Sequence, residues 1–177
     1  MSEFRPTLRP ALASRQAVVA ADFRLSPLPE GTIVHVLARP GQEGVVSFLG
    51  SLAGAAPHAL RPVSPDQWFI IRDDPTPHQD MKSLFAALEP RATGVDQSHG
   101  RVRIRIEGKM AQRALSKGTA LDLDPSAFPI GQSAATLIGH IAVHITRVGP
   151  DAFEIIVLRS FAESLWDDLA RMGLEFS

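Results

Sequence analysis

The chain has 177 residues, of which 45% are hydrophobic and 21% are charged, proportions that exclude a globally disordered protein. Eighteen basic residues nearly balance nineteen acidic ones, and the formal net charge of -1 argues against a nucleic-acid partner. Cysteine is absent, which excludes disulfides, a thiolate nucleophile and cysteine-ligated metal centres. The N-terminal segment lacks the apolar core of a signal peptide, and no apolar run reaches membrane-spanning length. We therefore expect a cytoplasmic protein without a membrane partner.

Residues 1–30 show little periodicity and contain four prolines, Pro6, Pro10, Pro27 and Pro29. Such a stretch cannot bury enough apolar surface by itself to offset the entropy of ordering it, although residues 11–23 could form a weak helix. We expect an extended N-terminal arm, which is either a frayed tail or a segment that lies on a partner subunit.

Residues 31–100 carry the pattern of a first α+β half. The segments 32–37, 60–63, 68–71 and 93–97 are predicted strands, and a Ser-Pro-Asp turn joins the second and third of them. Two segments repeat apolar residues at i, i+3, i+4 and i+7, which predicts helices over Val45–Leu52 and Met81–Leu88. The order of these elements is β-α-β-β-α-β.

Residues 101–177 follow the same plan in a second half. Apolar residues alternate with arginine over 101–106, and further strands are predicted over 141–145 and 153–158. Helices are predicted over 109–117, which Gly118 would cap, and after Ser160, where the spacing to Glu163 is that of a capping box. The sequence thus predicts an α+β fold with two ferredoxin-like halves, mainly antiparallel sheets, and a long loop around 121–132.

Motifs for catalysis or cofactor binding are absent from the sequence. It contains no phosphate loop, no GxGxxG dinucleotide fingerprint and no GxSxG nucleophile elbow. His140 and His144 have the spacing of a helical metal pair, but their segment alternates like a strand, so surface or partner-facing histidines are favoured. Asp122 and Asp124 are read as solvent-facing or partner-facing carboxylates rather than as an acid–base pair.

A row of three arginines, Arg101, Arg103 and Arg105, is the most distinctive charged feature. Because alternate residues of a strand share a face, the three guanidinium groups are expected on one side of the sheet. The row would form a solvated strand face or a protein docking surface, and RNA or a folate glutamate tail are weaker alternatives.

The C-terminal third resembles the gamma subunit family of heterotetrameric sarcosine oxidases. The resemblance rests on Lys117-Gly118, Leu121-Asp122-Leu123 and Phe128-Pro129, followed by Arg159-Ser160-Phe161-Ala162 and Leu165-Trp166, in that order. It covers roughly residues 101–176. Thr119 stands where family members commonly have cysteine.

The resemblance implies a fold like that of the glycine-cleavage T-protein and a complex with alpha, beta and delta subunits. That complex would demethylate sarcosine oxidatively to glycine, form hydrogen peroxide and transfer one carbon to tetrahydrofolate. FAD, FMN, NAD, tetrahydrofolate and zinc are expected on the partner subunits, with no catalytic, cofactor or metal site on this chain.

The chain would then supply surface, and we expect an exposed apolar patch on the loop 121–130. The candidate interface residues are those of the arginine row and four apolar residues of this loop, Leu121, Leu123, Phe128 and Ile130. The alternative is a free-standing folate-binding protein of the T-protein kind.

Overall fold

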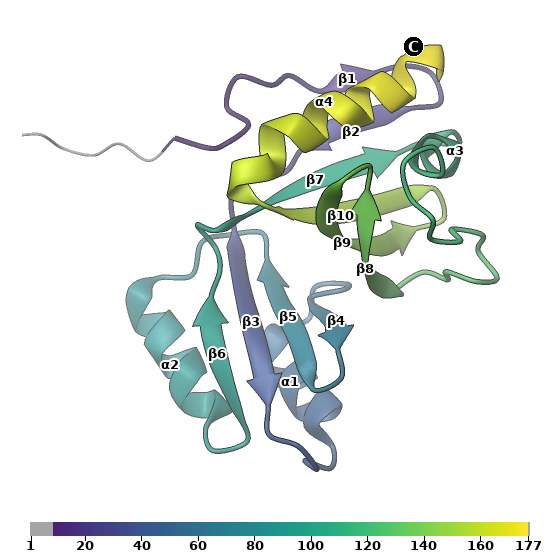
Figure 1. Cartoon of the computed structure of the whole chain (residues 1–177). Helices are drawn as coiled ribbons and strands as arrows, with labels where there is room; N and C mark the ends of the chain where they lie inside the picture. The colour runs from purple at the N-terminus through teal and green to yellow at the C-terminus, as the bar shows by residue number, and fades with distance from the viewer. Residues whose placement is uncertain (1–8, 177) are drawn as a thin grey trace, which may run out of the picture.

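The structure, a computed structural model, describes residues 9–176 as two α+β halves that each contain one β-sheet (Figure 1). The elements of the first half are β3 (Thr32–Ala38), α1 (Val45–Ala53), β4 (Leu60–Ser64), β5 (Gln67–Arg72), α2 (His78–Leu88) and β6 (Ala92–Asp96). Those of the second half are β7 (Arg101–Glu107), α3 (Ala111–Leu115), β8 (Ser133–Ile138), β9 (Ile141–Gly149), β10 (Ala152–Leu158), η1 (Arg159–Phe161), α4 (Ala162–Gly173) and η2 (Leu174–Phe176). Two N-terminal strands, β1 (Val18–Val19) and β2 (Arg24–Pro27), precede both halves in the chain.

The first half has the predicted ferredoxin-like arrangement. Its strand order is β4-β5-β3-β6, and all neighbouring strands are antiparallel. Helices α1 and α2 cover one face of this sheet because their apolar stripes pack against alternate strand residues. The buried residues of this layer include Val34, Val36, Leu49, Ile70, Leu84 and Leu88. Asp66 adopts a φ of 58° in the predicted turn between β4 and β5.

The second half has the same arrangement, but its fourth strand comes from the N-terminus. The strand order is β1-β2-β7-β10-β9-β8, and all neighbouring pairs are antiparallel. Strands β7, β9 and β10 with α3 and α4 follow the ferredoxin-like plan, and β2 occupies the edge position beside β7. Two additional strands, β1 and β8, extend the sheet at its two edges.

Residues 9–30 therefore do not form the extended arm that the sequence predicts. Leu12, Phe23 and Leu25 are buried in the core of the second half, and β2 pairs with β7 from Arg24–Glu107 to Pro27–Ile104. The strand is too short for its alternation to be recognised in the sequence, and its hydrogen-bond partners are β1 on one side and the edge of β7 on the other. The part of the expected arm before residue 9 lies outside the described residues.

Three further details of the second half differ from the sequence prediction. Strand β8, which pairs with β9, arises where a loop is expected. Helix α4 begins after a 3-10 turn with no side-chain hydrogen bond at its cap, so the predicted capping box does not form. Gly118 does not cap α3, because that helix ends at Leu115 and its C-cap residue is Ser116.

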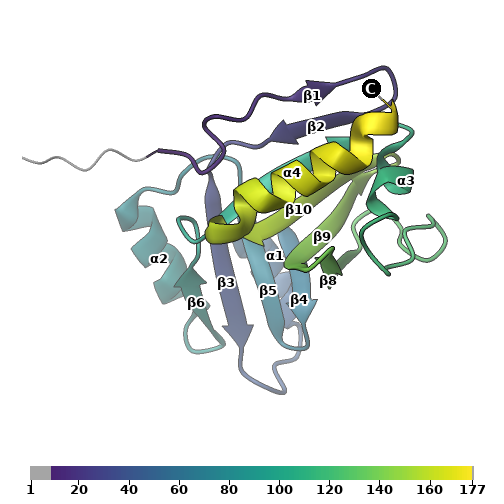
Figure 2. The same ribbon diagram turned by 45° about the horizontal axis from the view of Figure 1, so that its top comes forward.

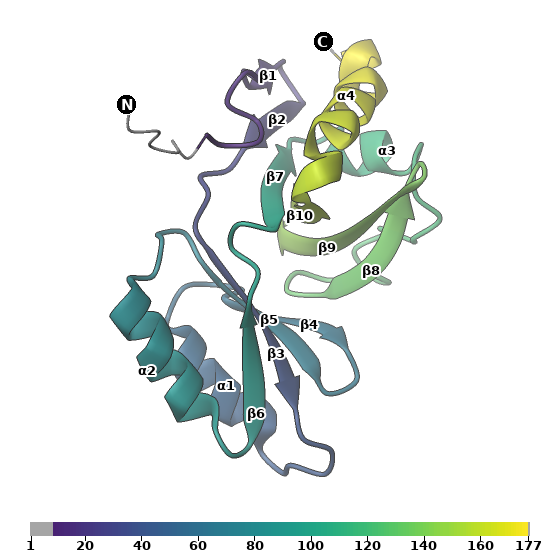
Figure 3. The ribbon, with the colours of Figure 1, turned by 60° about the vertical axis from the view of Figure 1, so that its left-hand side comes forward.

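The two sheets lie between two helical layers. Helices α3 and α4 cover the outer face of the six-stranded sheet, as α1 and α2 cover that of the other (Figures 1 and 2). The inner faces meet in a small third core made of Ile33, Phe69, Ile71 and Ile156. In Figure 3, β8 and β9 pass above β4 and β5, whereas the far ends of β3 and β6 extend away from the six-stranded sheet. We call the zone where the inner faces meet the seam.

Candidate partner interface

A buried ion cluster forms the polar part of the seam. The Arg61 Nη2 atom of β4 lies 2.5 Å from Glu154 Oε2 of β10, and both side chains are at most a tenth exposed. Arg103 of β7 reaches the same carboxylate at 3.8 Å and also Asp73 at 2.8 Å. Arg105 is within 4.0 Å of the other Glu154 oxygen. One glutamate thus holds together three arginines drawn from both halves.

Burial makes this cluster costly to disrupt. It lowers the pKa of Arg61 even though Glu154 acts in the opposite direction. Arg61 Nη1 and Arg103 Nε are buried without a hydrogen-bond partner within residues 9–176. Glu154 is therefore the acceptor on which the charge balance of the seam depends.

The structure divides the arginine row between the seam and the surface. The three side chains share one face of β7, as predicted, but that face is turned toward the first half. Arg103 is 4% exposed and its two Nη atoms contact Asp73 and Glu154, so it is not available for docking. Arg105 is half-buried beside Glu107 and Glu154. Arg101 alone remains without a carboxylate partner among the described residues; its Nε donates to Gln97.

The loop 121–130 does not present the apolar patch that the sequence predicts. Leu123 and Phe128 are each 1% exposed and belong to the core of the second half. The Arg147 side chain holds the loop from beneath by donating to the Leu123 carbonyl. Leu121 is partly buried against the same core, and Ile130 is exposed. Leu121, Leu123 and Phe128 of this loop thus pack against the core of the second half instead of facing solvent.

The remaining candidate groups have structural roles. His140 is exposed in the turn before β9, whereas His144 is buried and donates from Nε2 to the Pro62 carbonyl over 2.8 Å. Asp122 and Asp124 accept backbone N–H groups two residues ahead, in consecutive turns of the loop. Within residues 9–176 no group of three histidine or acidic side chains is arranged to hold a metal ion.

None of the helices in the described part of the chain combines the length and apolar composition needed to cross a bilayer.

Two central residues of the seam, Arg61 and Glu154, are not among the predicted site residues. A signal for Glu154 is present in the sequence, since it is an acidic residue inside the apolar strand Ala152–Leu158. A charge at such a position requires a buried partner of opposite sign. The sequence cannot identify that partner, because Arg61 is 93 residues away in the chain.

Comparison with known proteins provides the context for this geometry. The model of the family described as "Sarcosine oxidase, gamma subunit family" matches residues 40–174. The sarcosine oxidase subunit gamma of Corynebacterium sp. strain U-96 is 25% identical over 168 residues, covering 94% of this chain and 82% of that protein. The corresponding subunit of Arthrobacter sp. is 28% identical over 156 residues, covering 86% of this chain and 75% of that protein.

Solved structures confirm the fold. A chain of the heterotetrameric sarcosine oxidase from Corynebacterium sp. U-96 superposes with a TM-score of 0.80 at 21% identity, covering 96% of both chains. The glycine cleavage system aminomethyltransferase T from Bartonella henselae gives a TM-score of 0.60 at 16% identity, covering 85% of this chain and 46% of that one. The expected T-protein-like α+β fold is therefore correct. Because the family model spans most of the sequence, the chain belongs to the sarcosine oxidase gamma subunit family.

Proposed function

We propose that this chain is the gamma subunit of a heterotetrameric sarcosine oxidase. The observation that carries the proposal is the match of the family model over residues 40–174. The superposition with a heterotetrameric oxidase chain over 96% of both chains supports it, because the two chains have the same extent as well as the same fold.

In this role the chain contributes surface to an enzyme whose chemistry takes place on other subunits. We expect alpha, beta and delta partners, with FAD, FMN, NAD, tetrahydrofolate and zinc bound there. The complex would oxidise sarcosine to glycine, reduce oxygen to hydrogen peroxide and pass the methyl carbon to tetrahydrofolate. The rigid seam suits a subunit that holds its partners in fixed relative positions.

The alternative of a free-standing folate-binding protein loses its main support in this structure. That hypothesis requires the arginine row to receive the glutamate tail of folate. Arg103 is instead buried and paired with Asp73 and Glu154, and Arg105 is shared between two glutamates. Of the three arginines in the row, only Arg101 has no carboxylate partner among the described residues.

Affinity purification of the tagged chain from its native cells tests the proposal. We expect larger chains to co-purify and to show the absorbance of bound flavin. A colourless chain without partners would contradict it. Titration of the isolated chain with tetrahydrofolate is the second measurement, and tight binding would favour the free-standing alternative.

A further inference from the structure

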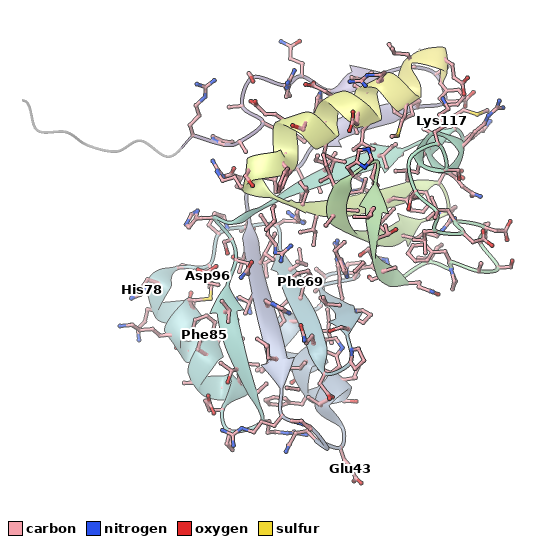
Figure 4. The ribbon with its side chains drawn as sticks, viewed as in Figure 1. Glu43, Phe69, His78, Phe85, Asp96 and Lys117 are labelled. Atoms are coloured by element: carbon pink, nitrogen blue, oxygen red, sulfur yellow. The ribbon has the colours of Figure 1, made fainter. Side chains whose placement is uncertain are left out.

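The seam opens on one side into a cleft of about 230 Å³. Its walls come from both sheets and are mainly apolar: Val63, Phe69, Ala135, Ala142 and Leu158. Arg101 and His144 are the two polar side chains that line it. Phe69 lies on β5 close to the six-stranded sheet (Figure 4), and its ring packs edge-on against His144 at a centroid distance of 5.3 Å.

Further exposed apolar side chains lie on the same inner faces of the two sheets. Strand register places Leu158 beside Arg101 and Leu137 beside Ala142 on the inner face of the six-stranded sheet. Leu37 and Val95 lie on the inner face of the four-stranded sheet, on β3 and β6. These four residues are between 38% and 53% exposed. They make up four of nine large apolar side chains that are exposed in the described chain, so such residues gather where the two sheets diverge.

Arg101 gives the cleft its charge. Its guanidinium carbon lies 4.9 Å from the Phe69 ring centroid, and its Nε donates to Gln97, while the two Nη atoms have no hydrogen-bond partner among the described residues. Partial burial lowers the pKa of Arg101 and no carboxylate in this part of the chain raises it. The other seam arginines, by contrast, share Glu154.

His144 adds an unused acceptor to the same cleft. Because its Nε2 donates to the Pro62 carbonyl, the neutral ring keeps the lone pair on Nδ1. That atom is buried and has no partner within residues 9–176, and the side chain is 3% exposed.

We propose that this cleft receives a segment of another oxidase subunit that carries an apolar side chain next to an aspartate or glutamate. The inference rests on the proposed function and assigns the docking site. The apolar walls take the side chain, and the Arg101 Nη atoms bind the carboxylate. Charge complementarity selects this occupant, because the cleft is lined by an uncompensated guanidinium and by no acidic residue.

Co-expression with the flavoprotein subunits of the same oxidase, followed by purification through a tag on a partner, tests the proposal. Arg101→Met removes the charge and retains most of the length of the side chain. Ala142→Glu places a carboxylate in the cleft at an exposed position, where it can pair with Arg101 and repel the partner. The matched controls are Arg171→Met on the exposed face of α4 and Val46→Glu on α1.

Both cleft variants should lower affinity for the partner by about tenfold or more, whereas the controls should bind like the parent chain. Binding by Arg101→Met should also depend less on salt concentration than that of the parent chain. Urea unfolding of each isolated variant shows whether it is folded. Unchanged binding by folded Arg101→Met and Ala142→Glu would overturn the cleft as docking site, even if the parent chain assembles. Failure of the parent chain itself to co-purify would overturn the proposed function and the inference with it.

Discussion

At the scale of single residues, the seam concentrates the charges on which the packing of the two halves depends. Glu154 compensates two arginines that are almost fully buried, one from each half. Breaking a buried pair by removing one partner is costly because the remaining charge stays desolvated. A half-exposed pair on the same sheet, Glu107 with Arg105, lacks this constraint because water solvates both groups.

Replacing Glu154 with glutamine should therefore destabilise the chain strongly. We expect a loss of about 3 kcal/mol in the free energy of unfolding, measured by urea denaturation at pH 7. Glu107→Gln is the matched control and should cost less than about 1 kcal/mol. Equal losses of unfolding free energy in the two variants would show that the seam cluster stabilises the fold no more than the half-exposed pair does.

His144 should make stability depend on pH. Burial is the main cause that lowers its pKa to about 4, and the nearby Arg61 and Arg101 lower it further against the hydrogen bond to Pro62. In the unfolded state the pKa of this histidine is about 6.5. Between about pH 6.5 and about pH 4 the unfolded state therefore binds more protons than the folded state, and stability falls as pH decreases through this range. The full contribution of His144 to this loss is about 3 kcal/mol.

His144→Gln removes the titrating group from the seam. The difference in unfolding free energy between pH 7 and pH 5 should become smaller in this variant than in the parent chain, since other groups titrate alike in both. An identical difference in the two proteins would refute the assignment of this pH dependence to His144.

At the scale of secondary-structure elements, the sequence predicts local patterns well and long-range placement poorly. Helices α1 and α2 and the strands of the first half follow from periodicity, because their apolar residues face a core within the same half. Strand β2 shows no such pattern in four residues and exists because β7 offers it an open edge. The loop 121–130 has the composition of an exposed patch, yet its largest side chain is buried.

Two apolar residues of that loop, Phe128 and Ile130, should respond differently to substitution. Phe128→Ala leaves a cavity in the core of the second half and should cost about 3 kcal/mol or more in unfolding free energy. Ile130→Ala removes a side chain that is 53% exposed and should change stability by no more than about 0.5 kcal/mol. Thermal or urea unfolding distinguishes them. A small effect at Phe128 would revive the hypothesis that the loop docks on a partner.

At the scale of the whole molecule, the two halves meet through a small apolar core, an ion cluster and the hydrogen bond from His144 to the Pro62 carbonyl. Ile156 of β10 is fully buried against Ile33, Phe69 and Ile71 of the first half. The two tryptophans lie one in each half, Trp68 on β5 and Trp166 on α4. They can therefore report on the unfolding of each half separately.

In each single-tryptophan variant, Trp68→Phe or Trp166→Phe, the fluorescence of the remaining tryptophan and the circular dichroism of the whole chain should show the same urea midpoint, because the seam couples the halves. Adding Ile156→Ala leaves a cavity in the seam core and should separate the two midpoints. Fluorescence and circular dichroism are the measurements. Midpoints that still coincide after Ile156→Ala would show that the halves are coupled by other contacts.

The sequence by itself determines the fold class, most element positions and, through the motifs of its C-terminal third, the family. Those features depend on residues that are close in the chain, so spacing and composition reveal them. Only the tertiary structure decides that β2 completes the second sheet, that Arg103 is buried while Arg101 stays free of carboxylates, and that Phe128 is a core residue. The physical reason is common to all three. Periodicity shows which residues share a face of a strand or helix, but what covers that face is set by contacts between residues far apart in the sequence.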